Sequence, residues 1–204
     1  MVFDLEELSY RESYRLLVNT VVPRPIALVT SLDARGTANA APFSFFNVMG
    51  HDPPVLVLGI ERRGPGVPKD TLRNITERGE FVVNLVNEAI AEAMNVCAVD
   101  FPPDVDELER AGLTAAPSTK VSVPRVLESP VSLECATREV LQLGEERRLV
   151  VGDVKALHVA DEYYDPEKGY VLTERLGLIG RMHGRGWYVR TTDLFYMERK
   201  QLEE

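Results

Sequence analysis

The sequence predicts a mainly β protein with peripheral helices, whose strands pair antiparallel in a barrel or a sandwich. Short apolar runs of strand length recur along the first half of the 204-residue chain. The second half carries a long hairpin, in which residues 131–143 and 148–160 flank a "GEER" turn. Few helical segments separate these strands, which disfavours a doubly wound parallel sheet.

The first elements along the chain are a helix and a hairpin. Apolar and aromatic residues recur at a loose helical spacing near the N-terminus, at Leu5, Leu8, Tyr10, Tyr14 and Leu17. Pro23 and Pro25 then exclude helix, and residues 26–32 form an apolar run of strand length. Gly36 closes a turn, so residues 37–43 are predicted as the second strand of an antiparallel hairpin.

A strand, a helix and another strand follow. The run "VLVLGI", residues 55–60, suits a strand that is buried on both faces. Asp70 is the predicted N-cap of a helix that ends at Gly79, and "EFVVNLV" is the next strand. The segment "NEAIAEAMNVCAVDF" is predicted as a helix that ends before Pro102, and "DVDELERAG" as a short helix after it.

Composition and charge exclude several classes of protein. The net charge of −9 and the pI near 5.0 disfavour nucleic-acid binding, which needs an extended basic surface. No apolar run approaches about 18 residues, so we expect no membrane span. The acidic N-terminal segment differs from a signal peptide, which predicts a cytoplasmic protein. The length suits a single domain over residues 1–204.

The cysteines and histidines predict neither a disulfide framework nor a metal centre. Cys97 and Cys135 are expected to be core thiols in a reducing compartment. The histidines stand far apart in the sequence, and none has a His or Cys at a metal-ligand spacing. The sequence also contains no Gly-x-Ser-x-Gly motif and no Gly-x-Gly-x-x-Gly fingerprint, which disfavours hydrolase chemistry and a Rossmann site.

A basic loop precedes the helix predicted after Asp70, although the chain as a whole is acidic; its cations are Arg62, Arg63 and Lys69. The start of a helix presents unpaired N–H groups and partial positive charge, to which Thr71 adds a hydroxyl and Lys69 a full charge. Two interpretations stay open from spacing alone. Either a phosphate binds here, or Asp70 simply caps the helix while Lys69 is solvated.

Several motifs stand in order over about residues 20–90: "VPRPIALVTSLDARGTANAAPFSFFNVMGHDPPVLVLGI", then "KDTLRNI", then "EFVVNLV". In this order they resemble the flavin-reductase-like family of FMN-binding split-barrel proteins, and "LGLIGRMHGRGWYVR" adds a weaker match. Residues 91–130 carry no motif that we assign. The resemblance implies an antiparallel six-stranded split β-barrel, a homodimer, and FMN bound in a crevice near the dimer interface.

The resemblance also implies a set of cofactor-binding residues. Along the isoalloxazine ring, with backbone N–H groups offered to its polar edge, it places Thr30, Ser31 and Leu32. In the facing wall it places Ala41, Pro42, Phe43 and Ser44, and near the ribityl chain Asn47. At the phosphate end it places Lys69, Asp70 and Thr71, with Arg24 as a further candidate. A C-terminal segment that closes over the cofactor contains Arg181, His183 and Gly184.

The function implied by the resemblance is that of an FMN-binding oxidoreductase that takes hydride from NAD(P)H and passes electrons to an acceptor. Hydride transfer to a flavin needs no acid, base or nucleophile in its first half-reaction, so no catalytic side chain is assigned. The main alternative is a flavin-binding electron carrier or sensor without NAD(P)H turnover. Two others are a split-barrel oxidase of the pyridoxine-phosphate type, which the position of "KDTLRNI" disfavours, and a cofactor-free interaction module.

Overall fold

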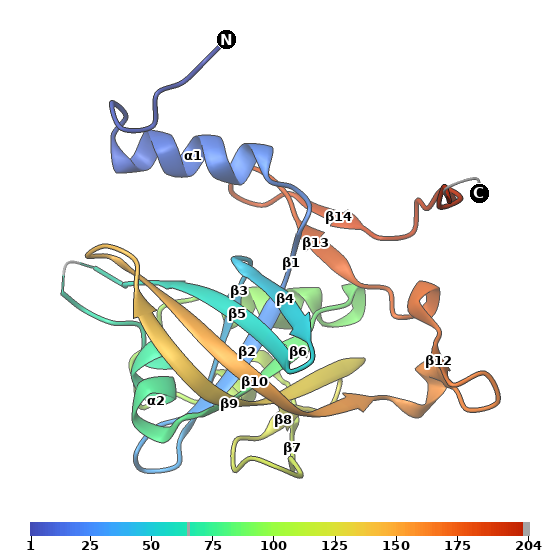
Figure 1. Ribbon diagram of the computed structural model, residues 1–204. Coiled ribbons are helices and arrows are strands. Elements are labelled where there is room, and N and C mark those ends of the chain that lie inside the picture. The colour runs from blue at the N-terminus through green and yellow to red at the C-terminus, as the bar shows by residue number, and fades with distance from the viewer. Residues whose placement is uncertain (65, 202–204) are drawn as a thin grey trace.

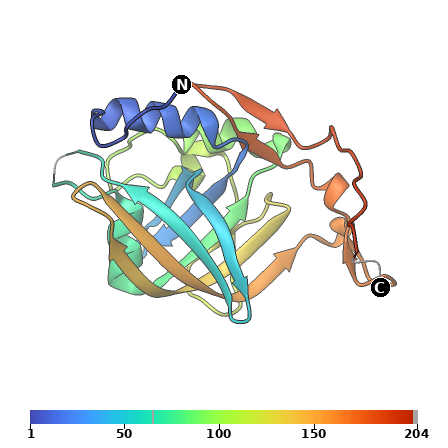
Figure 2. The same cartoon turned by 45° about the horizontal axis from the view of Figure 1, so that its top comes forward.

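The computed structural model describes residues 1–64 and 66–201, and a curved antiparallel sheet lies at its centre (Figure 1). The sheet has seven strands, in the order β3 (Ala38–Phe43), β2 (Ala27–Leu32), β6 (Glu80–Leu85), β9 (Val131–Gln142), β10 (Arg147–Val159), β5 (Pro54–Glu61) and β4 (Phe46–His51). It curls around an apolar core (Figure 2). The mainly β class with peripheral helices is confirmed.

Both predicted hairpins are present. β2 pairs with β3, with Ala27 opposite Phe43, and β9 pairs with β10 over most of their length. β10 has a register shift at Gly152, where a Cβ would lie 2.5 Å from Cζ of Phe81. Glycine at this position therefore lets the long hairpin bend closely over the core.

β4 is the strand of this sheet that the sequence analysis does not predict, and it makes the sheet one strand larger than the resemblance implied. Phe46 is buried, but the three side chains that follow are exposed, so the segment lacks the alternation of a half-buried strand. β4 is an edge strand that forms through its pairing with β5, which a local pattern does not reveal.

Two apolar clusters lie on opposite faces of β2, because alternate residues of the strand enter each of them. Ala27 and Val29 belong to the cluster inside the barrel. Leu28 belongs to a second cluster, which includes residues of α3 (Ala91–Val96) and α4 (Glu107–Ala111). β2 is thus buried on both faces. Burial on both faces was predicted for residues 55–60 instead, and that prediction is wrong: in β5 buried residues alternate with half-buried ones, because one face of the strand lies in the core.

Both cysteines are buried and free, which confirms the prediction of core thiols. Cys135 lies in the barrel cluster and Cys97 in the second cluster. Burial raises the pKa of both thiols, that of Cys97 to about 12, so neither is a reactive thiolate at neutral pH.

α1 (Tyr10–Thr20) lies outside the barrel and begins at a capping box formed by Ser9 and Glu12. Of its residues, only Val18 is buried. Aromatic and aliphatic side chains of this helix therefore remain on the surface, among them Tyr10 and Leu17.

α2 (Asp70–Arg78) packs against β2 and ends at Gly79, which adopts a left-handed conformation with φ of 72°. The prediction that Asp70 is its N-cap is wrong. Lys69 occupies the N-cap position, and Asp70 is the first helical residue, because its carboxylate is bonded to Arg63 instead of to the first turn.

The helix predicted for residues 87–101 is shorter in the structure. A 3-10 turn (Glu88–Ile90) leads into α3, which ends at Val96. The predicted short helix is α4, whose N-cap is Asp106. A small hairpin of β7 (Ala115–Ala116) and β8 (Arg125–Val126) follows.

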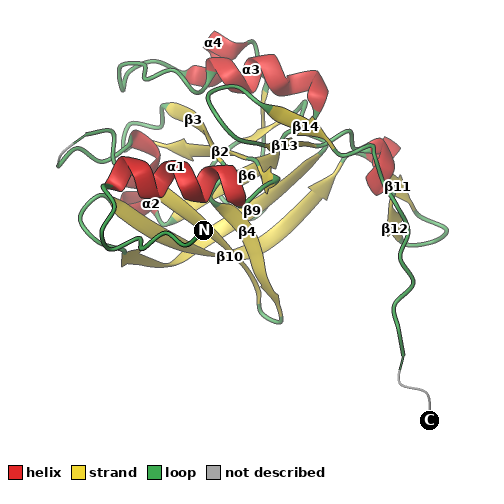
Figure 3. Ribbon diagram, turned by 90° about the horizontal axis from the view of Figure 1, so that it is seen from above, coloured by secondary structure: helices red, strands yellow, loops and turns green. Residues whose placement is uncertain are grey.

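The C-terminal part forms small elements beside the barrel: 3-10 turns at Asp161–Tyr163 and Thr173–Arg175, and the strands β11 (Tyr164–Asp165), β12 (Tyr170–Val171), β13 (Ile179–Arg181) and β14 (Tyr188–Arg190). β13 pairs with β14 and with β1 (Arg24–Pro25). Beyond β14 the chain runs away from the barrel (Figure 3). Among the described residues, no helix combines the length and apolarity that crossing a bilayer needs.

Candidate functional site

Three adjoining cavities lie along the edge strand β3, and together they form what we call the Pro42 crevice, because Pro42 lines each of them. One cavity reaches the start of α2, and a second reaches the β13–β14 hairpin. The third extends toward Tyr14 of α1 and Arg147 of β10. The crevice therefore joins segments that are far apart in the sequence.

The wall of the crevice is the end of β3 and the residue that follows it. Pro42 is tolerated there because β3 is an edge strand, in which the N–H groups of alternate residues face away from the ladder. Phe43 is buried and belongs to the barrel core, and it also lines two of the cavities. Ser44 is half-buried, and its hydroxyl accepts a hydrogen bond from Nε of Arg24 at 3.3 Å.

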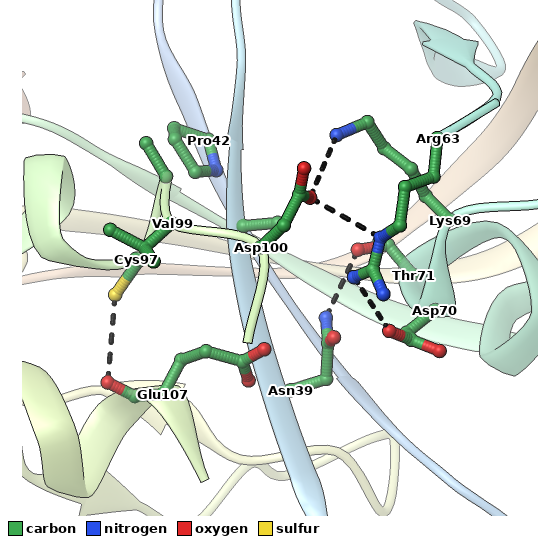
Figure 4. A pocket seen from close by; sticks show the side chains of 12 residues that line it. Asn39, Pro42, Arg63, Lys69, Asp70, Thr71, Cys97, Val99, Asp100 and Glu107 are labelled. Carbon is green, nitrogen blue, oxygen red and sulfur yellow. Dashed lines mark hydrogen bonds and ion pairs between the residues drawn. The ribbon is translucent and has the colours of Figure 1, made fainter. Parts of the chain in front are cut away.

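The start of α2 forms one end of the crevice (Figure 4). Thr71 is 1% exposed, and its hydroxyl accepts a hydrogen bond from Nδ2 of Asn39 at 3.0 Å. The N-cap Lys69 makes no side-chain hydrogen bond to the first turn. The N–H groups of this turn therefore stay available to an anion, and the nearby hydroxyl and ammonium are donors that suit a phosphate.

Charged side chains surround this end of the crevice (Figure 4). The carboxylate of Asp70 lies 2.9 Å from Nη2 of Arg63 and 2.6 Å from Nη2 of Arg73. The carboxylate of Asp100 lies 3.2 Å from Nε of Arg63 and 3.9 Å from Nζ of Lys69. Asp70 and Asp100 thus hold Arg63 at this end of the crevice, beside Lys69.

Glu107 is a further carboxylate of the crevice, and the sequence analysis does not predict it. It is buried, and its Oε2 accepts a hydrogen bond from the N–H of Ala40 at 3.0 Å. Burial raises the pKa of this carboxyl, and the hydrogen bond from Ala40 offsets that effect only in part. Among the described residues, no group of three or more His, Cys, Asp or Glu is arranged to hold a metal ion.

Thr30 and Ser31 line none of the three cavities, and their fully buried side chains bond within the protein. The hydroxyl of Thr30 donates to the carbonyl of Pro124 at 2.6 Å, and that of Ser31 accepts from Nδ2 of Asn74 at 3.2 Å. β6 pairs with β2 only as far as Thr30, so Ser31 and Leu32 have a strand partner on one side. The contact of these backbone N–H groups with a ring stays a prediction.

The β13–β14 hairpin forms the other end of the crevice, where Arg181 and Arg185 line it. The guanidinium of Arg181 donates to the carbonyls of Trp187 at 3.0 Å and Gly184 at 2.9 Å, which fixes the loop of the hairpin. His183 and Gly184 are exposed in this loop, and the ring of His183 stacks on Trp187 with centroids 6.0 Å apart.

Asn47 and Arg24 line an apolar groove beside β4 instead of the Pro42 crevice. Asn47 is exposed on β4. The buried guanidinium of Arg24 donates to the carbonyls of Val18 at 2.7 Å and Val21 at 2.8 Å, and to that of Met182 at 3.1 Å. Arg24 therefore joins the end of α1 to the β13–β14 hairpin. It does not line the cavity at the start of α2, where it was a further candidate for the phosphate.

The structure gathers eight of the predicted residues along the crevice: Ala41, Pro42, Phe43, Ser44, Lys69, Asp70, Thr71 and Arg181. The other six do not line these cavities: Thr30, Ser31, Leu32, Asn47, His183 and Gly184. It adds polar lining residues that the sequence analysis does not name, among them Glu61, Asn95, Asp100, Glu107, Arg147 and Arg185.

A comparison with models of protein families matches residues 19–176 to the flavin reductase like domain. The chain belongs to the flavin-reductase-like family. The matched range includes β3 and α2, which form the wall and one end of the crevice, whereas the β13–β14 hairpin lies beyond it. The resemblance inferred from the sequence motifs is therefore confirmed.

Solved structures of similar proteins cover nearly the whole chain. The 2-nitrobenzoate 2-nitroreductase NbaA of Pseudomonas fluorescens is 39% identical, with a TM-score of 0.89 over 98% of this chain and 96% of that one. Nitrilotriacetate monooxygenase component B of Bacillus cereus is 35% identical, with a TM-score of 0.91 over 97% and 98%. A proposed flavin reductase with split barrel domain from Shewanella frigidimarina NCIMB 400 is 22% identical, with a TM-score of 0.82 over 98% and 100%. The fold of this flavin-reductase-like protein is thus a split barrel.

Proposed function

We propose that this flavin-reductase-like protein is an FMN-binding oxidoreductase, which takes hydride from NADH or NADPH onto the flavin and passes the electrons to an acceptor. The start of α2 carries the proposal: its first turn has no side-chain cap from Lys69, and it opens with Thr71 into the Pro42 crevice. A helix start of this kind suits the phosphate of FMN, and the wall of β3 beside it suits a planar ring.

In this proposal the residues of the chain bind and orient the cofactor. Lys69, Thr71 and Arg63 hold the phosphate, and residues 41–44 flank the ring. Bound flavin supplies the chemistry that accepts hydride. The chain positions the ring and shields it from water, and Arg181 borders the far end of the crevice.

The similar proteins support an oxidoreductase. By their names, one is a nitroreductase and another is a monooxygenase component, and they are 39% and 35% identical to this chain. Membership of the flavin-reductase-like family supports a flavin as the group that both the crevice and the reaction use.

The proposal is tested by titrating the purified protein with FMN while visible absorbance and flavin fluorescence are recorded, and then by measuring oxidation of NADH and of NADPH. We expect FMN to bind with a Kd of roughly micromolar or lower, and the loaded protein to oxidise at least one nicotinamide. No spectral change would contradict flavin binding. Binding without oxidation of NADH or NADPH would favour an electron carrier or sensor.

We also propose that the protein is a homodimer. The groove beside β4 is lined by apolar side chains that are exposed in the single chain, among them Leu17, Val21, Met49 and Leu143. An exposed apolar surface of this kind is typical of a protein–protein interface. A second copy of the chain would cover it and shield the end of α1 from water.

A further inference from the structure

Asp100 lies at the mouth of the Pro42 crevice, where its carboxylate contacts two cations that also border the opening (Figure 4). The same oxygen, Oδ1, is 3.2 Å from Nε of Arg63 and 3.9 Å from Nζ of Lys69. An anionic oxygen between these two groups has the position and the charge that a phosphate oxygen would have beside the start of α2. The side chain of Asp100 therefore stands where the proposed phosphate would bind.

The charges at this end of the crevice agree with such a substitution. Arg63, Lys69 and Arg73 are three cations, and Asp70 and Asp100 are two carboxylates in contact with them. The group has a net charge of +1 while Asp100 is paired, and of +2 when Asp100 has moved away. The departure of Asp100 therefore raises by one the positive charge of this ion-paired group, beside which Glu107 is a further, buried carboxyl of the same cavity.

The two carboxylates differ in how firmly they are held. The side chain of Asp70 is only 9% exposed, and two arginines bind it. The side chain of Asp100 is 61% exposed and belongs to the irregular segment between α3 and α4. Asp70 is thus a fixed part of the site, whereas Asp100 can leave the cations for water at little cost, because exposed ion pairs contribute little stability.

We propose that Asp100 controls how tightly the flavin phosphate is held, by competing with it for Arg63 and Lys69. This inference rests on the proposed function, since it assumes that FMN binds with its phosphate at the start of α2. The competition weakens the binding of FMN and leaves a flavin without a phosphate unaffected. Asp100 thereby sets the preference between phosphorylated and unphosphorylated flavin and favours exchange of the bound FMN.

The test compares the Kd of FMN with that of riboflavin, which lacks the phosphate, for the wild-type protein, Asp100→Asn and Asp100→Ala. Asp104→Asn is the matched control, because Asp104 is exposed on the same segment and has no ion pair among the described residues. We expect both Asp100 variants to bind FMN about two- to fivefold more tightly, and riboflavin with the affinity of wild type. The gain should shrink as salt screens the exposed charges.

Each outcome decides the inference. Tighter FMN binding with unchanged riboflavin binding and a silent Asp104→Asn control supports it. Unchanged FMN binding in both Asp100 variants overturns it and leaves the proposed function intact. An equal gain for FMN and riboflavin also overturns it, because the effect would not act through the phosphate. Failure of the wild-type protein to bind either flavin overturns the proposed function and, with it, the inference.

Discussion

Thr71 and Lys69 hold their places at the start of α2 for different reasons. Thr71 is buried, and the amide of Asn39 fixes its hydroxyl from the neighbouring strand β3. Lys69 is partly exposed and contributes charge at the N-cap. A phosphate bound here would thus meet one rigid hydroxyl, one mobile cation and the N–H groups of the first turn.

The double substitution Lys69→Ala and Thr71→Ala is expected to weaken FMN binding by about 2–4 kcal/mol, because it removes two charge-assisted contacts. Riboflavin binding should change far less. Fluorescence titration with both flavins measures the effect, and Lys168→Ala, an exposed lysine outside the crevice, is the control. An FMN affinity equal to that of the wild-type protein would exclude the start of α2 as the phosphate site.

The sequence predicts the residues of the site that lie within short motifs, and it misses those that the tertiary fold brings in. The positions from Lys69 to Thr71 and from Ala41 to Ser44 were all predicted, and all line the crevice. Glu107 was not predicted, because its contact with Ala40 joins residues 67 positions apart. Its acidic neighbours give no local signal that distinguishes it from a solvated side chain.

At the scale of elements, β9 carries a buried carboxylate that holds the segment after β7 against the barrel. Glu134 is fully buried and accepts hydrogen bonds from the backbone N–H groups of Thr119 at 2.7 Å and Val121 at 3.1 Å. Nε2 of His158 on β10 contacts the same carboxylate. Burial alone would raise the pKa of Glu134, but the hydrogen bonds, that with His158 first, lower it to about 2.

Glu134→Gln is expected to lower the free energy of unfolding by about 2–3 kcal/mol at neutral pH, because an amide cannot accept all of these bonds. The carboxylate's contribution is present above its unfolded pKa of 4.5 and is lost as pH falls toward the folded value of about 2. The difference in the free energy of unfolding between wild type and variant should therefore decrease as the pH falls from about 4.5 to about 2. Denaturant unfolding measures it.

The control for this prediction is Glu139→Gln, because Glu139 is an exposed residue of the same strand. It should leave the free energy of unfolding nearly unchanged at each pH. If the difference in the free energy of unfolding between wild type and Glu134→Gln stays constant down to acid pH, the role of the ionised carboxylate is contradicted.

The sequence predicts those elements whose burial pattern is local. β2, β5 and β6 appear as apolar runs, and the β9–β10 hairpin appears through its turn. The sequence does not predict β4, because its side chains from Asn47 to Met49 are exposed and the strand forms through its pairing with β5. The helix predicted before Pro102 stops at Val96, since the backbone turns there through a bond from Ala98 N–H to the carbonyl of Asn95.

At the scale of the whole molecule, apolar surface gathers on the outer elements. α1 buries only Val18, and the segment after β14 extends from the barrel with four exposed apolar side chains in a row, from Leu194 to Met197 (Figure 3). Runs of this length on a surface are typical of segments that a partner covers. These side chains are not part of either apolar cluster of the single chain.

The combined substitution Met49→Asp and Leu143→Asp is expected to separate the proposed dimer into chains of 22.8 kDa. Both side chains are exposed in the single chain and line the groove beside β4. A carboxylate placed in a dry interface loses its hydration, so we expect association to weaken by at least about tenfold. Light scattering measures the mass, and Leu127→Asp, at an exposed apolar residue outside that groove, is the control.

The wild-type protein and the control should both scatter as two chains, because only the groove variant places charge where the second copy packs. A wild-type mass of one chain, or a double variant that stays dimeric, would show that this groove is not the interface.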